Sequence, residues 1–164
     1  MLIRSILSLC FAFSFTTIVA AQDVIRHRTP GSNFPIAAAV EVPAGKTVVY
    51  VSGMVPRVTN NDAPRNSIAS FGDTKAQTVS VLQAIEQALQ RINLTMKDVV
   101  KMQVFLVADP AKENRMDFAG FMEGYTQFFG TPEQPNLPSR SVMQVAGLVN
   151  PGWLVEIEVT AVRP

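Results

Sequence analysis

The fold class is decided by residues 72–109, GDTKAQTVSVLQAIEQALQRINLTMKDVVKMQVFLVAD, in which the spacing of the apolar residues changes from that of a helix to that of a strand. Thr74 and Gln77 fit a capping box at the start of a helix. An apolar stripe then runs to about residue 91 and predicts an amphipathic helix; its members are Val79, Leu82, Ile85, Leu89 and Ile92. Residues 98–107 alternate between apolar and polar side chains, which predicts a strand.

Two strands are predicted before this stretch. They are Asn33–Val42 and Thr47–Ser52, joined by a short loop of Pro, Ala, Gly and Lys. Residues 56–71 are rich in Asn, Asp, Ser and Pro. We therefore expect a long loop there, with room for one short strand.

A second helix and two more strands are predicted after it. Asp109-Pro110 is typical of a helix start, with Asp as the N-cap and Pro in the first turn. This helix is expected to end at Gly130, since glycine commonly follows the last helical residue. Residues 139–162, SRSVMQVAGLVNPGWLVEIEVTAV, contain two alternating stretches that predict the last two strands.

The order of these elements indicates an α+β fold, with a six-stranded sheet and two helices packed on one of its faces. The other face would expose apolar strand positions to water. Such a face favours a homo-oligomer that buries it. The apolar positions considered are Val51, Met102, Val104, Met143 and Val145.

Residues 1–21 have the composition of a secretory signal peptide: Arg4, then the apolar run 5–17, then the small residues Val19-Ala20-Ala21. An uncleaved membrane anchor is the alternative, but the run is shorter than the roughly 20 residues that cross a bilayer. We expect an exported, periplasmic protein. Its mature form would have a flexible N-terminus, 22–33, and one domain, 34–164.

The composition excludes several kinds of site. Cys10 is the only cysteine and His27 the only histidine. The mature chain therefore lacks thiol chemistry, a Ser-His-Asp triad and His or Cys metal clusters. Without Arg4 it has thirteen basic and thirteen acidic residues, so no basic face suggests nucleic acid. We expect no cofactor, no metal, no nucleic acid and, after cleavage, no membrane.

Three polar features remain as candidates for a site. Arg140 carries a planar fork suited to a carboxylate, and Glu156 could orient or activate a water. Ser52-Gly53 lies at a strand end. Each also has a structural interpretation: Arg140 in an ion pair, Glu156 on the solvated face of an alternating strand, and Ser52-Gly53 as a simple strand terminus.

Several segments together resemble the Rid (reactive intermediate deaminase, also called YjgF) family. They are VVYVSGMVP, the stretch 72–109, FAGFMEGYTQFF, PSRSVMQVAGL and LVEIEVTAV, in the order of that family and from about Phe34 onward. The resemblance implies a chorismate-mutase-like α+β fold with a mixed sheet. It also implies a homotrimer with clefts between subunits, and hydrolysis of 2-imino acids to 2-keto acids and ammonia without a cofactor.

By the same resemblance, Arg140 would bind the substrate carboxylate, Glu156 would lie near the catalytic water, and Ser52 with Gly53 would line the cleft. Four positions depart from the family pattern by losing a polar group. They are Ile36 in place of tyrosine, Met54 in place of glutamine, Met122 in place of asparagine and Val142 in place of cysteine. A cleft lined by these side chains should favour a carboxylate with a larger apolar tail.

Two functions follow from this reading. The first is hydrolytic deamination of reactive 2-imino or enamino acids in an inter-subunit cleft. The second is a non-catalytic trimeric protein that binds small carboxylates at the same clefts. A surface-active role resting on exposed apolar patches is a third, more distant hypothesis.

Overall fold

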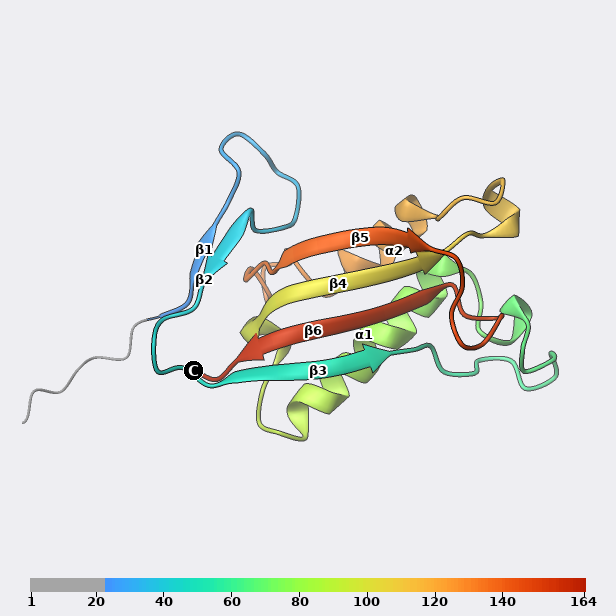
Figure 1. Ribbon diagram of the computed structural model, residues 1–164, viewed down its shortest axis with the longest axis horizontal. Coiled ribbons are helices and arrows are strands. Elements are labelled where there is room, and N and C mark those ends of the chain that lie inside the picture. Colours follow the sequence, from blue (N-terminus) through green and yellow to red (C-terminus); the bar gives the residue numbers. More distant parts are fainter. Residues whose placement is uncertain (1–22) are drawn as a thin grey trace, which may run out of the picture.

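A computed structural model describes residues 23–164, so the predicted signal peptide lies outside the described residues. Two helices cover one face of a sheet, and a small hairpin stands beside it (Figure 1). The strands are β1 (Ile25–His27), β2 (Ala39–Glu41), β3 (Val48–Met54), β4 (Val99–Val107), β5 (Ser139–Val145) and β6 (Val155–Val162). The helices are α1 (Thr74–Gln90) and α2 (Phe118–Tyr125), with short 3-10 helices η1 (Ile68–Ser70), η2 (Met96–Asp98) and η3 (Pro110–Lys112).

The main sheet has four strands in the order β3-β6-β4-β5. Strands β4 and β5 are parallel, and the other neighbours are antiparallel. The predicted α+β class and mixed sheet are therefore confirmed. Along β6, buried and partly exposed residues alternate, as expected for a sheet with one covered face.

The prediction of six strands in one sheet was wrong. In the segment Asn33–Val42 only β2 forms a strand, and it pairs with β1 in a separate two-stranded sheet. Pro35 has no N–H to donate, and only an isolated bridge from Ala37 to Ser139 joins this segment to the edge of β5. Part of the expected flexible N-terminus thus forms β1. No strand forms in residues 56–71, where η1 is found instead.

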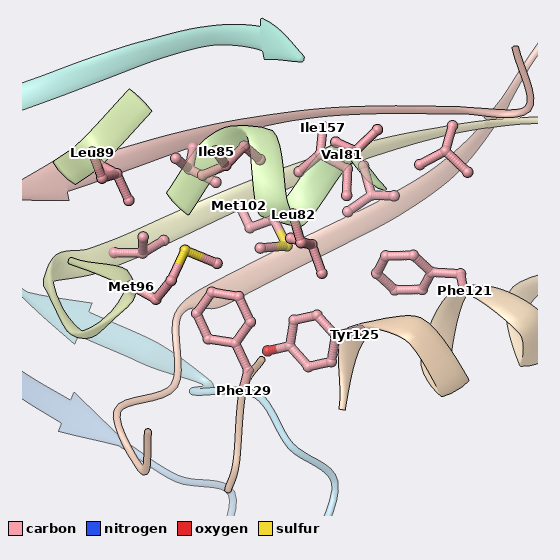
Figure 2. Close-up of a cluster of buried hydrophobic side chains, with 14 of the residues drawn as sticks. Val81, Leu82, Ile85, Leu89, Met96, Met102, Phe121, Tyr125, Phe129 and Ile157 are labelled. Atoms are coloured by element: carbon pink, nitrogen blue, oxygen red, sulfur yellow. The ribbon is translucent and has the colours of Figure 1, made fainter. Parts of the chain in front are cut away.

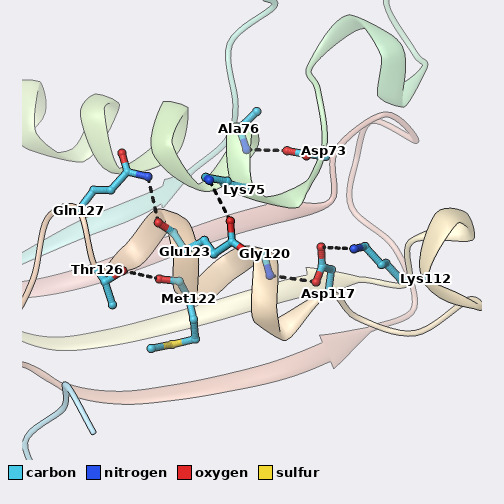
Figure 3. A network of polar contacts seen from close by, with 10 residues as sticks. All are labelled: Asp73, Lys75, Ala76, Lys112, Asp117, Gly120, Met122, Glu123, Thr126 and Gln127. Atoms are coloured by element: carbon cyan, nitrogen blue, oxygen red, sulfur yellow. Dashed lines mark hydrogen bonds and ion pairs between the residues drawn. The ribbon is translucent and has the colours of Figure 1, made fainter. Parts of the chain in front are cut away.

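The N-cap of the first helix lies one residue earlier than the sequence suggested. Asp73, not Thr74, is the N-cap: its carboxylate accepts a hydrogen bond of 2.8 Å from the Ala76 N–H (Figure 3). Both residue types cap helices well, so the sequence alone does not choose between them. The helical periodicity itself was predicted correctly, and Arg91 is the C-cap.

The second helix is shorter than predicted. Asp109-Pro110 starts only η3, because Glu113 and Asn114 then adopt positive φ angles of 57° and 56° that turn the chain. The N-cap of α2 is Asp117, whose carboxylate accepts from the Gly120 N–H at 2.9 Å (Figure 3). The helix then ends at Tyr125 rather than at Gly130.

The core lies between the helices and the covered face of the sheet (Figure 2). Leu82, Ile85 and Leu89 of α1 are fully buried, as the apolar stripe predicted. The two helices approach closely at Gly124, where an added Cβ would lie 2.8 Å from the side chain of Thr78. A larger residue there would push α1 and α2 apart.

The opposite face of the main sheet is open in the single chain. Of the five apolar positions expected there, Met102 and Val104 are instead fully buried beneath the helices, and Val51 packs against the core. The exposed apolar side chains on this face are Tyr50, Val48 and Met143, which are 82%, 39% and 37% exposed. Within residues 23–164, no helix has the length and apolar character that crossing a membrane requires.

Gln77 joins the turn just before α1 to the distant loop before β6 from inside the core. Its side-chain amide donates to the Gly72 and Gly152 carbonyls, both at 2.9 Å, and its oxygen accepts from the Leu154 N–H at 2.7 Å. It therefore pairs three backbone groups, two of them just before β6.

We expect Gln77→Ala to lower the free energy of unfolding by about 2–4 kcal/mol, because buried backbone groups lose their partners. The matched control is Gln83→Ala, an exposed glutamine on the same helix, for which a change within about 0.5 kcal/mol is expected. Urea unfolding followed by circular dichroism measures both. Equal stability of the two variants would contradict this role for Gln77.

Candidate functional site

Arg140 lies on the covered face of the sheet, near the start of β5. It pairs in register with Met102, which is fully buried, so its side chain points toward α2 rather than to the open face. The guanidinium carbon is 4.1 Å from the ring centroid of Tyr125, 5.0 Å from that of Phe121 and 5.5 Å from that of Phe34. We call these three rings the aromatic box. They hold the cation by cation–π attraction.

The guanidinium has no acidic partner. Among the described residues no ion pair includes Arg140, and its Nη1 atom is buried without a hydrogen bond. Nη2 donates to the Met122 sulfur at 3.2 Å. Burial lowers the pKa of Arg140, an effect that Tyr125 partly offsets. Since arginine keeps its proton in proteins, the result is a partly buried cation that lacks a counter-charge.

Two of the four positions that depart from the Rid pattern, Met122 and Val142, lie on the side of this cation, and a third, Ile36, lies in the segment that carries Phe34. Met122 extends from α2 on the side away from α1 (Figure 3). Val142 lies two residues beyond Arg140 on the same face of β5 and packs against the core. Ile36 is partly buried in the segment between Pro35, whose carbonyl accepts from the Tyr125 hydroxyl at 2.8 Å, and Ala37, which bridges to β5.

Glu156 lies on the other face of the sheet. It pairs in register with Phe105 of β4, whereas its neighbour Ile157 is fully buried on the covered face. Its carboxylate occupies the space in front of Gly53, so closely that a Cβ added to Gly53 would collide with it. Only glycine therefore fits at position 53 with Glu156 in this rotamer.

Ser52 and Gly53 form a bulge that brings the end of β3 to Glu156. The pairing of β3 with β6 shifts between Val51 and Met54, so that two residues of β3 oppose one of β6. Both bulge residues are exposed. Met54 does not join them, because it pairs with Ile157 and packs against the core.

The chain thus carries two half-sites on opposite faces of one sheet. We call them the cation half-site (Arg140, Ile36, Met122 and Val142, with the aromatic box) and the carboxylate half-site (Glu156, Ser52 and Gly53). Because the sheet separates them, Arg140 and Glu156 of one chain do not face a common ligand. In residues 23–164 no group of three His, Cys, Asp or Glu side chains gathers as metal ligands.

Sequence reasoning did not identify the aromatic box. Phe121 and Tyr125 lie within the predicted second helix, and both are fully buried. Their i, i+4 spacing places both rings under one neighbouring side chain, and this was the available signal. Phe34 stood in a segment predicted to be a strand, so nothing indicated that its ring would turn onto Arg140.

The Tyr125 phenol should ionise only at very high pH. Burial is the main cause that raises its pKa from 10.0 to about 12, although the Arg140 cation opposes the rise. The neutral phenol is thus favoured in the folded state. Its contribution to stability is complete below pH 10 and is lost as the pH rises through 12.

A Tyr50→Phe variant leaves Tyr125 as the only tyrosine, because the chain contains two. We expect its phenolate absorbance at 295 nm to appear in a step near pH 12, and this step to move down to the range of a free phenol in denaturant. A step near pH 10 in the folded protein would contradict the buried setting of Tyr125.

Comparison with known proteins places the chain in a family. Residues 30–163 match the protein family described as Endoribonuclease L-PSP. The chain is 34% identical over 127 residues to the 3-aminoacrylate deaminase RutC of Acinetobacter baylyi, a match that covers 77% of this chain and 88% of that protein.

Solved structures agree with this assignment. Escherichia coli TdcF with bound serine is 30% identical, with a TM-score of 0.55 over 87% of this chain and 99% of that one. YyfB of Yersinia pestis, a conserved Rid family protein, is 23% identical and has a TM-score of 0.63 over 85% of this chain and 98% of that one, a likeness that shows the fold alone. The resemblance seen in the sequence is therefore confirmed, and the chain belongs to the Endoribonuclease L-PSP family, which includes the YjgF and RutC proteins.

Proposed function

We propose that this protein hydrolyses reactive 2-imino or enamino acids to 2-keto acids and ammonia. The observation that carries the proposal is the guanidinium of Arg140, which is partly buried, has no acidic partner among residues 23–164 and keeps one nitrogen without a hydrogen bond. A buried, unpaired cation is costly, and a substrate carboxylate would satisfy it with two parallel hydrogen bonds. The similarity to a 3-aminoacrylate deaminase supports this choice of chemistry.

In the proposed mechanism Arg140 fixes the carboxylate, so that the adjacent C=N carbon has one orientation in the cleft. Glu156 positions a water and accepts one of its protons as the oxygen attacks that carbon. The C=N π electrons become a nitrogen lone pair, which takes the proton back from Glu156 to give a neutral carbinolamine. Glu156 then transfers the carbinolamine hydroxyl proton to the nitrogen, the oxygen forms a C=O double bond, and the C–N bond breaks to release ammonia. The 2-keto acid remains. Because such imines already hydrolyse in water, orientation and base catalysis are sufficient.

The cleft must contain two copies of the chain, because Arg140 and Glu156 lie on opposite faces of the sheet. We propose a homotrimer in which the cation half-site of one subunit meets the carboxylate half-site of the next. Supporting this, the open face carries the exposed Tyr50, Val48 and Met143, which an interface would bury. A heterologous contact of this kind closes into a ring when the rotation allows it.

The setting of this reaction is also part of the proposal. The predicted signal peptide would place the protein outside the cytoplasm, in the periplasm. The substrate would then be a small carboxylate released there, and no cofactor, metal, nucleic acid or membrane enters the mechanism.

We expect Arg140→Ala to lower kcat/KM for a freshly generated 2-imino acid by about 30-fold or more, since a carboxylate would lose its charged partner. Coupled assays of ammonia and keto acid measure the rate. The control is Arg91→Ala, an exposed arginine at the end of α1, which should retain full activity. A wild-type rate no higher than the uncatalysed rate would refute the proposed function.

Mixed oligomers test whether the two half-sites come from different subunits. Arg140→Ala and Glu156→Gln oligomers should each be inactive, whereas oligomers assembled from an equal mixture should regain about a quarter of the wild-type clefts. Co-expression with two affinity tags provides the mixture. If the mixture stays as inactive as its parts, the cleft does not combine residues of two chains.

A second candidate is a binding protein that holds carboxylates without turnover. Its supporting observation is the apolar surrounding of Arg140, where the guanidinium has three rings and a thioether as neighbours.

The Glu156→Gln variant separates the two candidate functions, and Glu158→Gln, on the same face of β6, is its control. In an enzyme only the former should lose activity, by about 100-fold. In a binding protein neither has activity to lose, and both should retain carboxylate affinity.

A further inference from the structure

A surface hollow of about 610 Å³ lies at the start of α2, beyond the cation half-site. Met116, Phe118 and Ala119 line it from α2 and the preceding loop, and Gln144 lines it from β5. Gln144 lies on the same face of β5 as Arg140 and Val142, and its side-chain oxygen accepts from the Met116 N–H at 2.8 Å. The proposed function does not use this hollow.

Two aromatic rings connect Arg140 to the hollow. The Phe34 ring lies 5.5 Å from the guanidinium carbon, and it stacks on Phe118, with ring centroids 6.5 Å apart and planes inclined by 21°. Phe118 in turn lines the hollow. A continuous aromatic surface therefore runs from the cation to the hollow.

Phe34 is the accessible member of the aromatic box. It is 43% exposed, whereas Phe121 and Tyr125 are 0% exposed. It lies in the segment between β1 and β2, outside any helix or strand. A ligand that approaches the buried Nη1 atom of Arg140 from solvent thus meets the Phe34 ring first, and this ring can move at the lowest cost of the three.

The charged side chains that line the hollow pair with one another, and the rest of its lining is mostly apolar. Its cations are already paired with its acids: Lys112 with Asp117 at 3.5 Å, and Arg115 with Glu113 at 2.7 Å. Apolar surface comes from Phe118, with Met116 and two alanines. A ligand held by one carboxylate at Arg140 would therefore extend an uncharged tail along Phe34 and Phe118.

We infer that Phe34 and Phe118 determine specificity, and that the preferred substrate is an arylalkyl 2-imino acid, the imine of an aromatic amino acid. Its carboxylate binds Arg140 and its ring stacks against Phe34 and Phe118 at the entrance of the hollow. A single methylene between the α-carbon and the aromatic ring of the substrate suits this path, because Phe118 stacks directly on Phe34. The inference rests on the proposed function and names the substrate class of that same site.

The first experiment uses carboxylates that cannot react, so that it is independent of turnover. Calorimetry compares 3-phenylpropanoate with propanoate on the full mature oligomer. We expect 3-phenylpropanoate to bind about tenfold more tightly, and Phe34→Ala and Phe118→Ala each to reduce this preference by about fivefold. Phe34→Leu should reduce it nearly as far, because leucine restores apolar contact but not a ring. The control is Ile25→Ala, an exposed apolar residue of β1.

The second experiment measures turnover of the phenylalanine-derived imine against the alanine-derived imine. The ratio of their kcat/KM values should exceed one in the wild type, fall about fivefold in Phe34→Ala and stay unchanged in Ile25→Ala. Equal affinity for the two carboxylates, or an unchanged preference in both phenylalanine variants, overturns the inference even if imines are hydrolysed. If no imine is hydrolysed, the proposed function fails, and the calorimetric preference still decides on the aromatic subsite.

Discussion

The alternation of β6 is the constraint on which both the core and the site depend. This strand lies between β3 and β4, and its residues Val155, Ile157 and Val159 are buried against the helices. A shift of its register by one residue would exchange the two faces of the strand and place carboxylates in the core, so the register is strongly fixed. Glu156 is thereby held on the open face. The parallel register of β4 with β5 fixes Arg140 on the covered face in the same way.

The cation half-site is built on the core itself. Tyr125 stacks on Phe129 with ring centroids 5.0 Å apart, supports the guanidinium on its ring and donates its hydroxyl hydrogen to Pro35. One fully buried residue thus fixes both Arg140 and the segment that carries Phe34. Cation–π contacts compensate only part of the cost of removing a guanidinium from water, typically by about 0.5–2 kcal/mol each. The remaining cost is what an anionic ligand can relieve, so the site is prepared for its ligand by the same packing that stabilises the fold.

Much of the fold could be predicted from the sequence, because the periodicities of α1, β4 and β6 are local properties. The errors arose where a local signal had two solutions or where the partner was distant. Asp73 and Thr74 are both good caps, and Gln77 was assigned to a capping box although its partners include Gly152 and Leu154, more than seventy residues away. Of the candidate residues, the structure brings Met122 to Arg140 and Ser52 with Gly53 to Glu156, whereas Met54 packs against the core. Their separation onto opposite faces depends on strand register, which alternation within each strand does not reveal.

The separation of the half-sites has a chemical consequence. In the proposed mechanism, Arg140 and the aromatic box on the covered face would determine which carboxylate is held, whereas Glu156 and the bulge at Gly53 on the open face would determine whether a water is presented. The positions that depart from the family pattern and lie near a half-site, Ile36, Met122 and Val142, all belong to the first. Glu156 and the glycine that makes room for it are kept in the second. Under the proposed function, these departures therefore fall in the part that would select the ligand and not in the part that would act on it, which is the pattern expected of an enzyme with altered specificity rather than of one reduced to binding.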